Sequence, residues 1–261
     1  MTHGEQTPDR RRLDGRVAFV TGVSRPVGIG ASVARRLHDH GATVVATGWP
    51  PHDAEMPWGG QRLDDMPFEV GRHDLEDPSV PASLVDGVFD AHGRLDIVAA
   101  VHARSSHQAF ADVTAAELDR CWAANVRSIV LLAQRFAARH APAPDGAPPT
   151  GRMVWFTSGQ HLAPMDDEIA YAVSKGALHQ MTRTLDRALS GSRIVANCIN
   201  PGPVDTGYAS GSSRTAVAAR FPDRRWGSPD DVADLVAFLV ADEGAWIRGQ
   251  VIDAEGGFRR W

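Results

Sequence analysis

The chain alternates short apolar runs with segments of helical periodicity along nearly its whole length, and this pattern constrains the fold most. Apolar runs typical of buried strands lie at 16–22, 43–47, 67–75, 95–101, 152–158, 193–200 and 249–257. Amphipathic segments separate most of these runs and lie at 30–41, 78–93, 114–140, 168–190 and 228–243. Short apolar strands that alternate with helices are typical of parallel β-α-β units. The pattern therefore predicts an α/β fold with one doubly wound, Rossmann-like parallel sheet of about seven strands and helices on both faces.

The organisation predicted from the sequence is that of a single domain. No internal repeat and no second apolar core interrupts 13–261, and we expect 1–12 to be a disordered polar tail. A polar, Ser- and Arg-rich segment at about 203–226 is the predicted substrate lid. The loops at 48–67 and 141–150 are rich in proline and glycine, and both are predicted to be exposed connections.

Charge and cysteine usage exclude several classes of partner. A net charge of -5 gives no electrostatic reason to expect nucleic acid or an anionic membrane. No apolar run approaches the roughly 20 residues that a membrane span requires. The two cysteines, Cys121 and Cys198, form no C-x-x-C pattern, which favours a reducing, cytoplasmic location. The 11 histidines show no metal-ligand spacing, so no metal site is predicted.

A glycine-rich loop, "VTGVSRPVGIGA" at 20–31, lies between the first predicted strand and the first predicted helix. Its glycines are Gly22, Gly28 and Gly30. A strand, a glycine loop and a helix N-terminus in this order present free backbone N–H groups to a pyrophosphate. Glycines also occur in ordinary turns, and only the strand before and the helix after make a nucleotide site the better interpretation.

The residues around this loop favour NADP(H), with NAD(H) as the alternative. An NAD site usually has Asp or Glu at the end of the second strand, and no acid lies there, near Gly48. Arg25 lies inside the glycine loop, where a guanidinium would attract a 2′-phosphate. Arg25 could instead be a solvent-facing loop residue. Asp74 could accept a hydrogen bond from the adenine amino group or could begin a helix.

The segment "EIAYAVSKGAL" at 168–178 holds Lys175, the single lysine among 27 lysine and arginine residues. Tyr171 precedes it by four residues, so both side chains share one face of the predicted helix. A nearby cation stabilises a phenolate and lowers the tyrosine pKa, which suits acid–base chemistry on a carbonyl oxygen. Ser158 ends a strand at the ligand-binding edge, and Asn125 could hold a water behind Lys175. Each residue alone has a structural interpretation, but the joint spacing favours catalysis.

These motifs together resemble the classical short-chain dehydrogenase/reductase family over about 14–258, and look most like its bacterial 3-oxoacyl-carrier-protein reductases. The matching segments read "TGVSRPVGIG", "HDL", "NVRS", "TSG", "YAVSK" and "NPGPVDTG". The resemblance implies a nicotinamide cofactor and interconversion of a carbonyl and an alcohol. It implies that Ser158, Tyr171, Lys175 and Asn125 are catalytic. The implied cofactor-binding residues are Gly22, Ser24, Arg25, Gly28, Ile29, Gly30, Asp74, Leu75, Tyr171, Lys175, Pro201, Gly202, Val204 and Thr206.

Two departures from the family pattern concern the cofactor site. The glycine loop is two residues longer than the usual T-G-x3-G-x-G and contains Pro26. The fourth strand runs into "IVAAVHARSS" at 97–106, where an Asn-Asn-Ala-Gly motif is expected, so the usual support for the cofactor and the central strand is missing. Neither departure touches the predicted acid–base residues.

The function predicted from the sequence is NADP(H)-dependent hydride transfer to or from a small-molecule carbonyl or secondary alcohol. Arg104, His161 and Tyr208 are the candidate substrate residues. The resemblance implies a homo-oligomer, a tetramer or a dimer, joined through the helices at 114–140 and 168–190. One alternative is an enoyl reductase, although those enzymes usually have six residues between Tyr and Lys rather than three. The other is a non-catalytic NADP(H)-binding sensor or scaffold.

Overall fold

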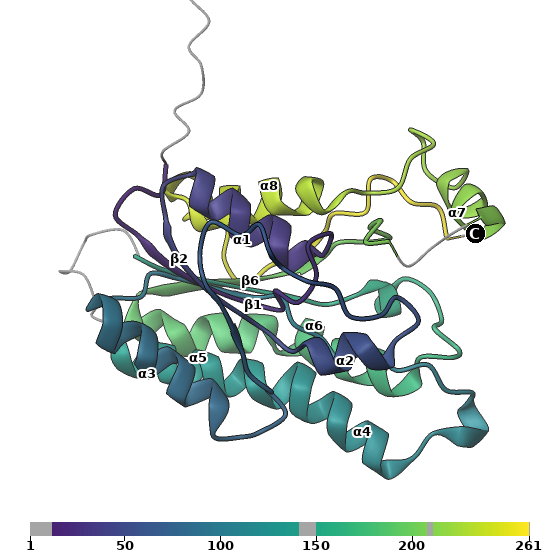
Figure 1. Ribbon diagram of the computed structural model, residues 1–261, viewed down its shortest axis with the longest axis horizontal. Coiled ribbons are helices and arrows are strands. Elements are labelled where there is room, and N and C mark those ends of the chain that lie inside the picture. Colours follow the sequence, from purple (N-terminus) through teal and green to yellow (C-terminus); the bar gives the residue numbers. More distant parts are fainter. Residues whose placement is uncertain (1–11, 141–149, 208–210, 261) are drawn as a thin grey trace, which may run out of the picture.

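The computed structural model describes residues 12–140, 150–207 and 211–260 (Figure 1). The predicted polar tail, apart from Arg12, and the predicted connection at 141–150, apart from Thr150, lie outside these residues, as does Tyr208. Over the described ranges, no helix is long and apolar enough to cross a membrane.

All seven strands lie parallel in one sheet, which confirms the predicted fold class. Their order across the sheet is β3-β2-β1-β4-β5-β6-β7. The strands are β1 (Val17–Thr21), β2 (Thr43–Gly48), β3 (Val70–Arg72), β4 (Ile97–Ala100), β5 (Gly151–Phe156), β6 (Ile194–Asn200) and β7 (Val251–Asp253). The five residues of β1, the four of β4 and the six of β5 are buried throughout, as expected for central strands covered on both faces.

Helices cover both faces of the sheet (Figure 1). The helices are α1 (Ile29–Asp39), α2 (Pro50–Glu55), α3 (Val80–His92), α4 (Ala115–Trp122), α5 (Ser128–Arg139), α6 (Ile169–Leu189), α7 (Gly211–Ala218) and α8 (Pro229–Val240). α1 packs beside α8 on one face, while α3, α5 and α6 cover the other (Figure 1). Each face has its own cluster of buried apolar side chains, so the sheet lies between two hydrophobic cores.

The strand order reverses between β1 and β4, and this reversal positions the site. The chain winds outward from β1 through β2 to β3, then returns to β4 on the other side of β1. The connections that follow β1 and β4 therefore diverge and leave a crevice at the carboxyl ends of these strands, where ligands bind in open α/β sheets. Gly22 and Val101, which follow the two strands, line this crevice.

The helix predicted over 114–140 is interrupted at its middle. It begins as predicted, because the Thr114 hydroxyl accepts a hydrogen bond of 3.2 Å from the backbone N–H of Glu117. A π-helical turn, Ala123–Arg127, then separates α4 from α5. Such turns add one residue to the helical repeat and occur often at functional sites. The turn contains Asn125, whose buried side chain bonds to two other segments.

The prediction of an exposed connection at 48–67 is wrong for the first part of this segment. Residues Pro50–Glu55 form α2, and Asp53 in that helix is only 7% exposed. Asp53 is stabilised there by an ion pair with Arg25 and a hydrogen bond from Trp58. Burial of a carboxylate is tolerated when it is paired in this way. The segment therefore contributes to the wall of the crevice.

Candidate functional site

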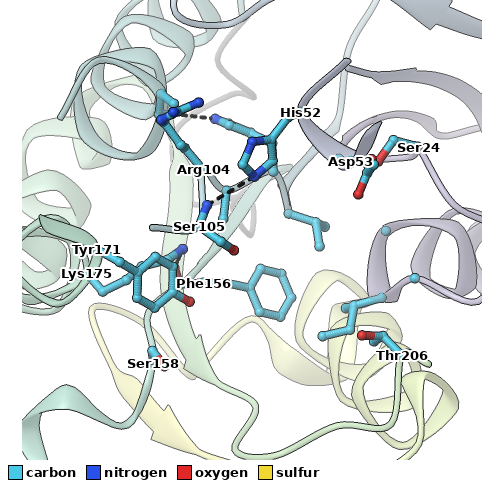
Figure 2. Close-up of a pocket in the computed structure, with 18 of the residues that line it drawn as sticks. Ser24, His52, Asp53, Arg104, Ser105, Phe156, Ser158, Tyr171, Lys175 and Thr206 are labelled. Carbon is cyan, nitrogen blue, oxygen red and sulfur yellow. Dashed lines mark hydrogen bonds between the residues drawn. The ribbon is translucent and has the colours of Figure 1, made fainter. Parts of the chain in front are cut away.

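A cavity of about 560 Å³ lies at the carboxyl edge of the sheet (Figure 2). It is lined by the glycine loop, α2, the ends of β2 and β5, the segments after β4 and β6, and the first turns of α6. Predicted site residues among its lining are Gly22, Ser24, Arg25, Gly28, Ile29, Gly30, Asp74, Leu75, Arg104, Ser158, Tyr171, Lys175, Pro201, Gly202, Val204 and Thr206. Fifteen of these sixteen were predicted as catalytic or cofactor-binding, and the fold brings them to one cleft although they come from five separate parts of the chain.

Tyr171 and Lys175 lie together on α6, as their spacing predicts (Figure 2). The Lys175 ammonium lies 5.5 Å from the centroid of the Tyr171 ring. It donates a hydrogen bond of 2.7 Å to the backbone carbonyl of Phe156, and the residue is only 2% exposed. Burial lowers the pKa of Lys175 to about 8. At neutral pH the site therefore contains a buried cation beside the phenol, and that cation loses its proton near the upper end of the physiological range.

Ser158 follows β5 and lines the same cleft as Tyr171 (Figure 2). Its backbone is extended, and its N–H donates a hydrogen bond of 3.1 Å to the side-chain oxygen of Gln160. The neighbouring Thr157 hydroxyl donates to the carbonyl of Lys175 at 2.8 Å. These bonds fasten the end of β5 to α6, so the hydroxyl of Ser158 is held on the side of the cleft where Tyr171 lies.

Asn125 lies behind the cleft, fully buried in the π-helical turn. Its side-chain oxygen accepts a hydrogen bond of 2.7 Å from the N–H of Arg104, and its amide donates to the Arg104 carbonyl at 3.0 Å. The same amide donates to the hydroxyl of Ser174 at 2.9 Å, and Ser174 donates to the Tyr171 carbonyl. Asn125 thus joins the segment after β4 to the turn of α6 that carries Tyr171. Its predicted part in a proton relay stays a prediction.

His102 occupies the place where the Asn-Asn-Ala-Gly motif was expected. Its Nδ1 lies 2.6 Å from the Thr21 hydroxyl, and its Nε2 lies 3.0 Å from the Ala124 carbonyl and 2.8 Å from the Ser128 hydroxyl. Burial, together with the charge of Lys175, lowers the pKa of His102 to about 3. The neutral ring therefore donates from Nε2 to the carbonyl and accepts at Nδ1 from Thr21. It links β1 to the π-helical turn, a structural role that the sequence did not predict.

The depressed pKa of His102 predicts a contribution to the pH dependence of stability. The unfolded chain binds a proton at this histidine below about pH 6.5 and the folded chain does not, so stability falls as the pH drops from about 6.5 toward 3. In His102→Asn, the slope of the unfolding free energy against pH should decrease by up to about 1.4 kcal/mol per pH unit in this window. Urea denaturation of the wild-type protein and of His102→Asn at several pH values measures this slope. Identical slopes would show that His102 is charged in the folded protein or unimportant to its acid stability.

The glycine loop and the start of α1 have the donor chemistry that a pyrophosphate requires. Gly28 caps α1 without a side-chain hydrogen bond, and the first turn contains no acidic residue. A Cβ atom at Gly30 would lie 2.3 Å from the carbonyl oxygen of Gly22, so only glycine allows the loop to approach the helix this closely. The helix N-terminus lines the cleft, and the first N–H groups of a helix have no partner within the helix and a dipole that favours anions. These residues fit the nicotinamide dinucleotide expected from the sequence, despite the two additional loop residues.

The remaining predicted cofactor residues lie along the same cleft. Asp74 accepts a hydrogen bond of 2.9 Å from the N–H of Glu76, so it also shapes the turn before α3. Leu75 is buried and lines the cleft. On the opposite wall, Gly202 has a positive φ of 62°, and the backbone beyond it carries Thr206 toward Arg25. An elongated ligand in the cleft would thus lie between the wall that contains Asp74 and Leu75 and the wall that contains Gly202 and Thr206.

The candidate substrate residues are arranged less simply. The Arg104 guanidinium makes two hydrogen bonds of 2.9 Å with Glu117 and one of 3.3 Å with Glu76, so its charge is already paired. His161 does not line the cleft, and its Nε2 lies 3.1 Å from a carboxylate oxygen of Asp253. The predicted contact of Arg104 and His161 with substrate stays a prediction. Both side chains already bond to carboxylates of the protein, which does not favour such a contact.

Arg260 is a residue of the cleft that sequence reasoning missed. Its guanidinium packs against Gly159, next to Ser158, and it pairs with Glu255. It lines the cleft although it is the penultimate residue of the chain. No motif surrounds it, and only the path of the chain after β7 brings it here, so no sequence signal could have identified it.

Comparisons with known proteins identify the family of the chain. A family model described as "Enoyl-(Acyl carrier protein) reductase" matches residues 22–259. The chain is 34% identical over 247 residues to the uncharacterized oxidoreductase YjdA of Bacillus subtilis, covering 94% of this chain and 97% of that protein. It is 30% identical to a chloroplastic NADPH-dependent aldehyde reductase-like protein of Arabidopsis thaliana, covering 98% and 99%. A short-chain dehydrogenase from Burkholderia cenocepacia, solved in complex with NADP, is 32% identical with a TM-score of 0.79, covering 94% and 98%.

Proposed function

Because the chain belongs to the short-chain dehydrogenase/reductase family, we propose that it is an NADP(H)-dependent oxidoreductase that interconverts a carbonyl group and a secondary alcohol. The observation that carries this proposal is the convergence of Tyr171, Lys175 and Ser158 on one side of the cleft (Figure 2). Each of the three supplies a different part of acid–base chemistry on one oxygen atom. The cleft beside them has the donors that a dinucleotide needs.

The proposed mechanism assigns each proton and each charge to a residue. A nicotinamide held in the cleft would supply the hydride to the substrate carbonyl carbon, or would accept it in the reverse direction. The Tyr171 hydroxyl donates a proton to the carbonyl oxygen as negative charge develops there. The Ser158 hydroxyl donates a hydrogen bond to the same oxygen and fixes its position. The buried Lys175 ammonium stabilises the phenolate that Tyr171 becomes.

Two kinds of observation support the proposed cofactor: the residues that line the cleft and the similarity to proteins named for NADP or NADPH. Ile29 and Gly30 begin α1 directly after the N-cap Gly28, and the first turn of the helix would hold the pyrophosphate with backbone N–H groups. Arg25 lines the same part of the cleft and would supply positive charge for a 2′-phosphate. The Burkholderia neighbour solved with NADP and the NADPH-dependent relative of Arabidopsis support this choice. We therefore propose NADP(H) as the favoured cofactor and NAD(H) as the alternative.

Enoyl reduction is the second candidate function, favoured by the description of the matching family model. In that reaction the hydride reaches a carbon–carbon double bond conjugated to the carbonyl. The arrangement of Tyr171 four residues before Lys175, with Ser158 at the end of β5, supports carbonyl chemistry instead. A substrate panel that contains both ketones and conjugated enones separates the two activities.

The proposal is tested by titration of the purified protein with NADPH and with NADH, followed by turnover on that panel. We expect NADPH to bind with a micromolar dissociation constant, on the order of the KM values typical of enzymes. We also expect NADPH consumption with at least one class of ketone and none with saturated esters. Binding without turnover on any carbonyl or enone would favour a cofactor-binding sensor. Failure to bind either nucleotide would contradict the proposed function.

A further inference from the structure

Arg25 is not free in the cleft, because three segments of the chain already hold its guanidinium. Its Nε lies 3.3 Å from a carboxylate oxygen of Asp53 on α2. Its two terminal nitrogens donate to Thr206, one to the carbonyl at 3.0 Å and the other to the hydroxyl at 3.3 Å. The face of the guanidinium lies 5.1 Å from the centroid of the Trp58 ring. Arg25 thus bridges α2 and the segment after β6 across the mouth of the cleft.

The sequence has no acid at the end of β2, where an NAD site usually has one, but Asp53 follows shortly after that strand. That strand ends at Gly48, and Asp53 lies five residues further along the chain, in a segment with no recognisable motif. The short helix α2 turns it back toward the glycine loop. The Trp58 indole N–H donates to the same carboxylate oxygen at 2.8 Å and fixes its orientation. The side chains of Arg25 and Asp53 are only 11% and 9% exposed, so water screens this pair weakly.

We propose that Asp53 is a cofactor-selectivity residue: its carboxylate masks the charge of Arg25 and reduces the preference of the site for NADP(H) over NAD(H). This inference rests on the proposed function, since it concerns how the same cleft discriminates two nicotinamide cofactors. It assigns selectivity to the pair of Arg25 and Asp53 rather than to Arg25 alone. Figure 2 shows Asp53 beside Ser24 of the glycine loop, on the wall of the cleft opposite Tyr171 and Lys175.

The physical reason is competition between two anions for one cation. A 2′-phosphate carries between one and two negative charges near neutral pH and pairs well with a guanidinium. Here it must displace the Asp53 carboxylate from Arg25 or lie close to it, and two like charges a few ångströms apart repel strongly where water is scarce. A 2′-hydroxyl has no charge and meets neither cost. The pair therefore penalises NADPH selectively and leaves the affinity for NADH nearly unaffected.

The test is calorimetric titration of Asp53→Asn and of the wild-type protein with NADPH and NADH. Asparagine keeps the size of the side chain and removes its charge. We expect Asp53→Asn to bind NADPH about tenfold more tightly, which corresponds to about 1.4 kcal/mol, while its affinity for NADH stays within about twofold. An unchanged ratio of the two dissociation constants, or an equal loss of both affinities, would overturn the proposal.

The matched control is Glu55→Gln, which removes one negative charge from the same helix. Glu55 is exposed, and the partners of Arg25 among the described residues are Asp53, Thr206 and Trp58, so we expect the ratio to change by less than about twofold. A shift as large as that of Asp53→Asn would mean that general charge, not the pair, sets the ratio, and would overturn the proposal.

Trp58→Phe keeps an aromatic ring beside Arg25 but removes the N–H that holds Asp53. Trp58→Phe should therefore shift the ratio of the NADPH and NADH dissociation constants in the same direction as Asp53→Asn, by a smaller amount. It provides a second test of the proposal should Asp53→Asn fold poorly.

The titrations also separate this inference from the proposed function. If the wild-type protein binds both nucleotides and Asp53→Asn keeps the wild-type ratio, only the masking role of Asp53 fails. If neither nucleotide binds to any of the proteins, the proposed function and the inference fail together. Arg25→Gln completes the set, because it should weaken NADPH binding about tenfold and leave NADH binding unchanged if Arg25 contacts the phosphate. Equal affinities of Arg25→Gln and wild type for NADPH would overturn the inference.

Discussion

Replacement of Tyr171 by phenylalanine is expected to lower turnover at least about a thousandfold and to leave NADPH binding within about twofold. The hydroxyl of Tyr171 is the proposed proton donor to the carbonyl oxygen. Phenylalanine keeps the ring that lies 5.5 Å from the Lys175 ammonium, so the first turns of α6 should retain their packing. Steady-state rates with a responsive ketone, together with a calorimetric NADPH titration, measure the two quantities separately.

The control for Tyr171→Phe is Val173→Ala on the same helix. Val173 is 55% exposed and does not line the cleft, so its truncation should change neither turnover nor binding by more than about twofold. Turnover by Tyr171→Phe within tenfold of wild type would remove Tyr171 from the proposed mechanism. Equal losses of turnover and NADPH binding would indicate a structural or binding role rather than proton transfer.

Replacement of Lys175 by methionine is expected to lower turnover near pH 7 by about two to three orders of magnitude. Methionine approximates the length of the buried side chain and removes the positive charge beside Tyr171. In the wild-type protein the ammonium is protonated below about pH 8 and favours the phenolate. Without it, the Tyr171 phenolate loses electrostatic stabilisation from the neighbouring cation. Alcohol oxidation requires the phenolate, so the residual activity in that direction should move to higher pH by one unit or more.

The pH profile distinguishes this role of Lys175 from a purely structural one. The ammonium also donates a hydrogen bond to the Phe156 carbonyl, so Lys175→Met should lower the melting temperature as well. Lys175→Arg retains a cation, and we expect an intermediate rate with a profile closer to that of the wild type. If Lys175→Met loses activity but keeps the wild-type profile, the lysine acts through packing alone. Melting temperatures of the three proteins show how much of the loss comes from destabilisation.

The chain's own pattern was sufficient to predict the sheet and the positions of Tyr171, Lys175 and Ser158. Apolar runs at each strand position alternate with helical segments, and burial of those runs requires a sheet covered on both faces, which the structure contains. The four-residue spacing of Tyr171 and Lys175 is a local property of any helix, so their proximity followed from the sequence. Ser158 was predictable for a similar reason, since parallel strands bring their carboxyl ends to one edge of a sheet.

Other features depend on contacts between segments far apart in the sequence, and no local pattern shows such contacts. The apolar run that ends before His102 predicted a strand, but not that its imidazole would bond to Thr21 and to the Ala124 carbonyl. The interruption between α4 and α5 was hidden within continuous helical periodicity, because the bonds of Asn125 to Arg104 and Ser174 form only in the folded chain.

The fold class, the glycine loop and the helix that carries Tyr171 and Lys175 are predictable from the sequence, because each depends on periodicity or on spacing within one segment. The electrostatics around the loop depend instead on how distant segments pack together. The sequence predicted Arg25 as a ligand of a 2′-phosphate or as a solvent-facing loop residue, but α2 places an Asp53 oxygen 3.3 Å from its Nε, with Trp58 beside both. Charge pairing depends on distance in space, and residues 25 and 53 come within ion-pair distance only after β2 and α2 have packed against the sheet.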